Sequence, residues 1–134
     1  MNALVWVSEW QIQCCGEPFA VGERVDWTLR DDPDRAWLAA ALGPELAQSV
    51  SHVEDHHYGV PEEVSPVRAR VLGIRRAYCR YAAAPGGDSH PPYPVPGSAV
   101  LTEVDRADGW EAEMSGLHFN GYLVELDVFR AVPA

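Results

Sequence analysis

The chain has 134 residues, of which 47% are hydrophobic, and a formal net charge of −10; this length suits one domain with a single core over residues 1–134. The negative charge opposes binding to nucleic acid or to anionic lipid, and no stretch approaches the roughly 20 apolar residues of a membrane span. Because the start of the chain lacks the basic segment of a signal peptide and three cysteines make a poor disulfide framework, we expect an acidic cytoplasmic protein.

The first thirty residues predict β-structure. Residues 3–13 are rich in β-branched and aromatic side chains, which is typical of a strand, although their alternation is imperfect. Residues 20–30 alternate more regularly between apolar and polar side chains. The apolar face of this second predicted strand consists of Val21, Val25, Trp27 and Leu29.

A helical insertion is expected at about 33–57. Asp32-Pro33-Asp34 supplies a helix-capping residue, a proline for the first turn and a carboxylate near the positive end of the helix dipole. Gly43-Pro44 interrupts this helix, and a second helix is predicted from Glu45 to about His57. The helical spacing places Leu46, Val50, Val53 and His57 on its inner face.

The second half of the chain returns to β-structure. Residues 67–81 are long for one strand, and Gly73 indicates a bulge or bend within it. The Pro/Gly-rich stretch 84–98 predicts a loop. After it we expect a strand over 99–105, a turn over 107–109, a short strand opening at Trp110, and a last strand over 119–129 with Tyr122, Val124, Leu126 and Val128 on one face.

These elements together predict a mainly β (α+β) fold. About five strands with one helical insertion are typical of a small curved barrel, SH3-like or OB-like.

Four segments carry a resemblance to a known family. They are the stretch Trp10-Gln-Ile-Gln-Cys-Cys-Gly-Glu-Pro-Phe-Ala-Val-Gly22, then Glu54-Asp-His-His-Tyr-Gly59, Tyr93-Pro-Val-Pro-Gly-Ser98 and Asp105-Arg-Ala-Asp-Gly-Trp110. With these segments the chain resembles a family of small proteins from high-GC bacteria whose domain has no known function. The resemblance implies a cytosolic domain that stands alone, and it implies no activity, substrate or catalytic residue.

A zinc site is one reading of the cysteines and histidines. Cys14 and Cys15 are adjacent, and the following glycine permits a turn that would bring both thiols to one ion. His52 and His56 stand four apart, which on a helix directs both toward one side. The metal ligands, if there are any, are then expected among Cys14, Cys15, His56 and His57. In the alternative reading His57 belongs to the core, His52 and His56 are solvated, and no cofactor binds.

Arginines are concentrated in one predicted strand. Half of the ten arginines fall between Arg68 and Arg80, where there is no acidic residue. In an unbroken strand Arg68, Arg70, Arg76 and Arg80 share one face and could bind an anion, whereas Cys79 lies on the other face as a buried thiol. A bulge at Gly73 would break this register. At a net charge of −10, pairing with the protein's own carboxylates is the simpler role for these arginines.

We therefore expect a non-enzymatic β-barrel that acts as a protein-interaction or regulatory module with a protein partner, and we assign no catalytic residue. Its binding surface is predicted where 14–19 meets 54–59, because both segments hold residue types that packing does not require. The residues of that surface are Cys14, Cys15, Glu17, His56 and His57. Two alternatives stay open. One is a zinc protein or metallohydrolase with Glu17 or Glu54 as a base, and the other is a nucleotide or single-stranded nucleic-acid binder that uses the arginines of 68–80.

Overall fold

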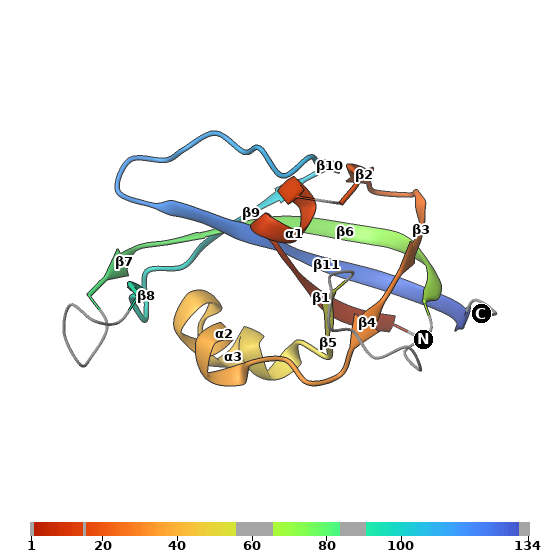
Figure 1. Ribbon diagram of the computed structural model, residues 1–134, viewed down its shortest axis with the longest axis horizontal. Helices are drawn as coiled ribbons and strands as arrows, with labels where there is room; N and C mark the ends of the chain where they lie inside the picture. Colours follow the sequence, from red (N-terminus) through yellow and green to blue (C-terminus); the bar gives the residue numbers. More distant parts are fainter. Residues whose placement is uncertain (1, 15, 56–65, 84–90, 132–134) are drawn as a thin grey trace.

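The computed structural model describes residues 2–14, 16–55, 66–83 and 91–131. Within these ranges the chain is rich in strands, and its main sheet curves into a nearly closed barrel with three short helices (Figure 1). The expectation of a mainly β barrel with a helical insertion is therefore confirmed. No described helix is both long enough and apolar enough to cross a membrane.

The wall of the barrel follows one path of neighbouring strands, β3-β6-β11-β1-β5-β4. Their bounds are β1 (Asn2–Ser8), β3 (Arg24–Trp27), β4 (Leu29–Arg30), β5 (His52–Glu54), β6 (Val67–Cys79) and β11 (His118–Ala131). β1 and β5 pair in parallel, and the other neighbours along the path are antiparallel. The two strands at the ends of the path, β3 and β4, are separated only by Thr28, whose carbonyl accepts the N–H of Asp55 at 3.0 Å. The continuous chain through Thr28 thus brings the two ends of the sheet together.

Smaller elements complete the sheet system. β9 (Val100–Val104) pairs with the second half of β6, on the same edge whose first half pairs with β3. Two separate ribbons are formed by β2 (Phe19–Ala20) with β10 (Arg106–Ala107), and by β7 (Tyr81–Ala82) with β8 (Tyr93–Pro94). The segment predicted to be a Pro/Gly-rich loop, 84–98, thus contains β8, and its residues 84–90 lie outside the described ranges.

Apolar residues on both faces of the sheet are buried, each face in its own cluster. The barrel interior holds alternate residues of the long strands, among them Val5, Val124 and Leu126, together with four aromatic rings. These rings are Phe19, Tyr78, Phe119 and Tyr122. The outer face contributes Trp6 and Leu123 to a second cluster that α2 (Arg35–Leu42) and α3 (Pro44–Ser49) cover. The period-two pattern of β1 and β11 therefore supplies both clusters.

The predicted first strand is half wrong. Residues 3–8 do lie in β1, but the next six residues form a helix, α1 (Glu9–Cys14). The pairing of β1 with β11 ends at Ser8, opposite Gly121, so the sheet no longer constrains the backbone beyond that point. Three of the six residues of α1 are Glu or Gln, which have a high helix propensity. The helix buries Gln11 and Ile12 against the barrel.

The second predicted strand is divided. Only residues 24–30 run along the sheet, where Val25, Trp27 and Leu29 pack against the interior cluster as expected. Val21 instead lies at a turn with 43% of its surface exposed, because the chain bends away after β2.

The helical insertion begins two residues later than predicted, with Asp34 instead of Asp32 as the cap, and it ends early. Asp34 caps α2 by accepting the N–H of Trp37 at 3.1 Å, and Gly43, with a φ of 95°, separates α2 from α3. The second helix was expected to reach His57, but α3 ends at Ser49 and His52–Glu54 is strand β5. Parallel pairing with β1 holds this short strand in place. His52 therefore lies in a strand, and the prediction that a helix directs His52 and His56 toward one side is wrong. His56 and His57 lie outside the described residues.

A bulge divides β6, as Gly73 indicated. Gly73 pairs with Glu125 and Val71 with Leu126, so Leu72 is the extra residue. Ala69 and Val71 before the bulge, and Ile74 and Tyr78 after it, all face the barrel interior. The inward face therefore changes from odd to even residues within this strand.

Two further expectations concern the last third of the chain. The prediction of a strand that opens at Trp110 is wrong, because this residue lies in irregular backbone with 70% of its surface exposed. The final strand, β11, confirms the last prediction, and Tyr122, Val124, Leu126 and Val128 share the interior face.

Candidate functional site

The structure brings together part of the surface predicted from the cysteine and histidine segments. Cys14 is exposed at the end of α1, and Glu17 and Glu54 line one pocket of ≈ 490 Å³ beside β3. Glu54 is buried within this pocket, whereas Glu17 is exposed. Cys15, His56 and His57 lie outside the described residues. Among the residues that are described, no group of three or more His, Cys, Asp and Glu side chains is arranged to hold a metal ion.

The predicted arginine face is not continuous. The bulge at Leu72 leaves Arg68 and Arg70 on the outer face but places Arg76 on the face of Tyr78, with its guanidinium 5.7 Å from the ring centroid. Arg68 pairs with Asp26 at 3.1 Å, and Arg76 pairs with Glu111 at 3.1 Å.

The other two members of the set make different contacts. Arg70 donates to the carbonyl of Gly22 at 2.8 Å, and Arg80 lies beyond the end of β6. Two of the four arginines thus pair with the chain's own carboxylates, which is the simpler role expected for them, and Arg70 binds a backbone carbonyl.

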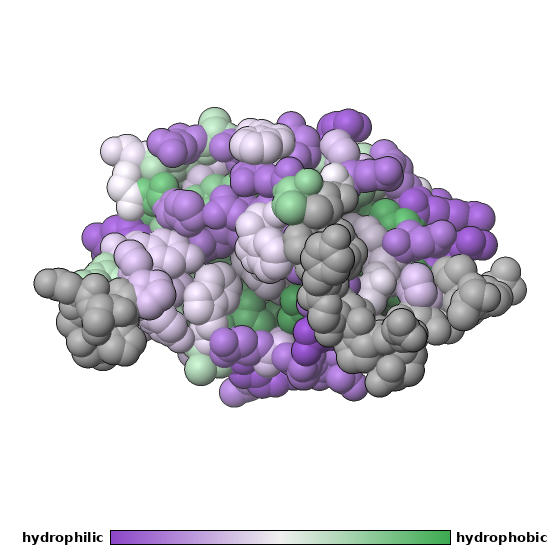
Figure 2. Space-filling view, in the orientation of Figure 1, coloured by the Kyte–Doolittle hydropathy of each residue, from purple (hydrophilic) through white to green (hydrophobic). Residues whose placement is uncertain are grey.

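A different hollow combines three tryptophans with several charged side chains. It has a volume of ≈ 510 Å³ and lies between α1, α2 and the paired strands β4 and β5, with β7 at one end (Figure 1). We call it the tryptophan groove, because Trp6, Trp10 and Trp37 all line it. In the space-filling view of the same face, hydrophilic and near-neutral surfaces surround small apolar areas above α2 and α3 (Figure 2).

Aromatic rings from three elements form the apolar part of the tryptophan groove. Trp6 of β1 is buried, and its ring centroid lies 5.8 Å from that of Trp37 on α2 at an interplanar angle of 53°. The indole N–H of Trp6 donates to the hydroxyl of Ser8 at 3.1 Å, which fixes the orientation of the ring. Trp10 of α1 exposes 53% of its surface at the rim.

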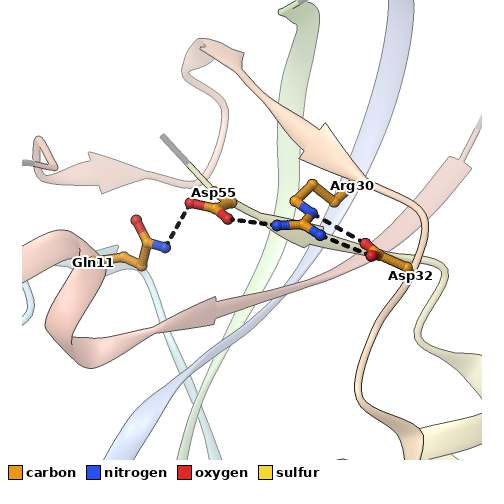
Figure 3. Close-up of polar contacts among 4 residues, drawn as sticks. All are labelled: Gln11, Arg30, Asp32 and Asp55. Atoms are coloured by element: carbon orange, nitrogen blue, oxygen red, sulfur yellow. Dashed lines mark hydrogen bonds and ion pairs between the residues drawn. The ribbon is translucent and has the colours of Figure 1, made fainter. Parts of the chain in front are cut away.

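A chain of hydrogen bonds forms the polar wall of the groove (Figure 3). Gln11 donates to one oxygen of Asp55 at 3.0 Å, and the other oxygen of Asp55 accepts from Arg30 at 3.3 Å. Arg30 also binds Asp32 with two donors, Nε at 3.1 Å and Nη2 at 2.8 Å. The four residues come from α1, β4, the turn before α2 and the end of β5, so this chain of contacts links the elements around the groove.

The ion pair of this wall shifts both of its members toward the charged form. Hydrogen bonding to Asp32, and then to Asp55, raises the pKa of Arg30 above its ordinary value. The same contact with Arg30 lowers the pKa of Asp32 below its ordinary value of 3.8. Both side chains therefore stay charged across the physiological range of pH.

A second polar chain occupies the β7 end of the groove. The Tyr81 hydroxyl donates to Asn120 Oδ1 at 2.5 Å, and Asn120 Nδ2 donates to the sulfur of Cys79 at 3.0 Å. Burial raises the pKa of Tyr81 and that of the Cys79 thiol, so both groups stay protonated at neutral pH. Cys79 is thus the buried thiol that the sequence predicted. The ring of Tyr81 stands edge-on to His118, which pairs with Glu9 at 2.9 Å.

The residues of the tryptophan groove are absent from the surface predicted from the sequence. Trp6, Trp10 and Trp37 are separated in the chain, so their positions in the sequence do not show that they lie together. One signal was nevertheless present, because the stretch Arg30-Asp-Asp-Pro-Asp34 places four charged side chains just ahead of a helix whose first turn carries the half-buried Trp37. Only the folded barrel brings this stretch beside α1.

Comparison with known proteins places the chain in one family. No curated protein and no solved structure matches it. The model of a family of unknown function, DUF6578, matches residues 1–128. This match spans nearly the whole chain, and the protein therefore belongs to the DUF6578 family.

Proposed function

We propose that this protein is a non-enzymatic protein-interaction module and that the tryptophan groove is its binding surface. The observation that carries the proposal is the combination of Trp6, Trp10 and Trp37 with a hydrogen-bonded charged wall in one open hollow. Tryptophan and arginine are the side chains that contribute most to binding energy in protein interfaces.

The ordered walls of the groove support this role. Trp6 and Trp37 pack against each other, and Arg30 is fixed by carboxylates on two sides. Side chains already held in place lose little conformational entropy when a partner binds, so a larger share of the contact energy becomes affinity. Trp10 is the exposed member and the first that a partner would contact.

We further propose that the protein acts in the cytoplasm. Cys79 is a buried thiol, and such thiols persist in a reducing compartment. Fractionation of the host cell, with the protein detected by antibody, tests this placement. Its recovery in a membrane or secreted fraction would contradict the placement.

Photocrosslinking in the host cell tests the binding surface. A benzophenone side chain in place of Trp10 puts the reactive group at the rim of the groove, and the same group in place of Trp110 is the matched control at an exposed tryptophan that does not line it. We expect discrete adducts from position 10 that are absent from position 110 and that disappear when Trp37→Ala is added. Identical adducts from both positions, or adducts that persist in the Trp37→Ala background, would refute the proposal.

A further inference from the structure

We infer that the tryptophan groove accepts an arginine side chain presented by a partner polypeptide. The inference rests on the proposed function and specifies the chemistry of the partner. Its first basis is charge, because four carboxylates and one guanidinium line the groove. These residues are Glu9, Asp32, Asp34, Asp55 and Arg30.

The internal ion pairs leave negative charge at the rim. Arg30 is held by Asp32 and Asp55, so the remaining carboxylates are those of Asp34 and Glu9. Asp34 Oδ1 accepts the N–H of Trp37, and a carboxylate has further lone pairs to offer a donor. Glu9 is similar, since only its Oε1 contacts His118 in the hydrogen bond described above. An anionic or purely apolar ligand would desolvate these carboxylates without compensation.

The second basis is the aromatic lining. A cation over the face of an aromatic ring is attracted by the ring quadrupole, tryptophan is the strongest such partner, and arginine is the cation most often found there. Trp10 and Trp37 line the same hollow as Asp34 and Glu9. One guanidinium can therefore stack on an indole while its N–H groups reach a carboxylate.

The groove already holds one guanidinium against carboxylates. Arg30 forms a two-donor contact with Asp32 in the wall, at 3.1 and 2.8 Å. Arginine is more weakly hydrated than lysine, and its planar group suits both stacking and two-point contact with a carboxylate. These properties favour arginine over lysine. The net charge of −10 would also attract a basic partner before contact.

The five tryptophan side chains provide the test. In two-dimensional ¹H–¹⁵N spectra each indole N–H gives a signal, and Trp27 and Trp110, which do not line the groove, are internal controls. The probe is the blocked tripeptide Gly-Arg-Gly, compared with its lysine and citrulline counterparts; citrulline keeps the shape of arginine but carries no charge. We expect saturable shifts of Trp10 and Trp37 with the arginine peptide and at least about tenfold weaker binding of the citrulline peptide.

A variant that removes one negative charge from the rim tests the role of the rim carboxylates. Asp34→Asn keeps a good helix cap while removing one carboxylate, so we expect arginine binding to weaken about two- to fivefold. Glu103→Gln on β9 removes the same charge at a place that does not line the groove, and it should leave the affinity unchanged. Equal binding of the arginine and citrulline peptides, tighter binding of the lysine peptide, or an equal response of Trp110 would overturn the inference. If the crosslinks from position 10 persist in that case, the groove binds a partner of another chemistry and the proposed function stands.

Discussion

Arg30 is the neighbour that lowers the pKa of the Asp32 carboxyl most. The two hydrogen bonds from this guanidinium lower the pKa of Asp32 below its ordinary value of 3.8. In Arg30→Gln we expect the pKa of Asp32 to return toward 3.8. Arg68→Gln is the control, because it removes a similarly exposed arginine from the pair with Asp26 and should leave the pKa of Asp32 unchanged. Titration of the side-chain carboxyl by NMR measures both variants.

The sign of the linked effect on stability follows from the direction of this shift. A pKa that is lower in the folded state favours folding at all pH values above the unfolded pKa, and this contribution is lost as the pH falls through the folded pKa. Acid unfolding of Arg30→Gln should therefore lack the part of the pH dependence that Asp32 contributes. An unchanged pKa of Asp32 in this variant would show that Arg30 does not cause the lowered pKa.

Tyr122 holds the segment after β10 against the barrel through its buried hydroxyl. This hydroxyl donates to Glu111 at 2.7 Å and accepts the N–H of Gly109 at 3.1 Å. Tyr122→Phe removes the acceptor of the Gly109 N–H and the donor to Glu111 Oε2, while Glu111 Oε1 still binds Arg76, so we expect a loss of about 1–3 kcal/mol in the free energy of unfolding. Urea unfolding measures it. In a double-mutant cycle with Glu111→Ala the combined loss should be smaller than the sum, and additive losses would refute the coupling.

Among the elements, β1 and β11 approach closely at one glycine. Gly121 has a φ of 148°, and a Cβ there would meet the carbonyl oxygen of Val7 at 2.2 Å. Gly121→Ala is therefore expected to cost more than about 3 kcal/mol, from the clash and the backbone conformation together. Gly116→Ala is the control, because its φ is also positive at 76° but no atom lies within 4 Å of its Cβ. We expect only about 1 kcal/mol there. Similar losses in chemical unfolding would contradict the close approach.

Some elements of this fold could be predicted from the sequence pattern and others could not. β6 and β11 were predicted because long alternation survives even a bulge, and α2 because Asp32-Pro33-Asp34 and Gly43 mark its ends chemically, although Asp34 and not Asp32 is the cap. β5 was missed because three residues are too few to show a period of two, and its place depends on parallel pairing with β1, about 45 residues away in the chain. Tertiary contact decides such short strands, not local propensity.

At the scale of the whole molecule, the tryptophan groove was out of reach of sequence analysis for a related reason. Its residues come from seven elements and the turns between them, and each tryptophan taken alone has the properties of a core residue. Two segments that were predicted to meet, 14–19 and 54–59, do contribute Glu17 and Glu54 to one pocket. The composition gives the net negative charge of the chain, but it does not show where the carboxylates gather. The closure of the barrel places β4 and β5 beside α1, and this arrangement brings the carboxylates to the groove.

The net charge of −10 predicts that salt acts in opposite directions on folding and on binding. Like charges repel within the compact state, so screening them should stabilise the fold. Between about 20 and about 200 mM NaCl, where the screening length shortens severalfold, we expect Tm to rise by a few degrees. Over the same range the affinity for the arginine peptide should fall, because the attraction between the rim carboxylates and the guanidinium is screened. Thermal unfolding and the indole titration, carried out in the same buffers, measure the two effects. A Tm that falls with salt would mean that exposed pairs such as Arg68–Asp26 outweigh the general repulsion, contrary to their usual small contribution.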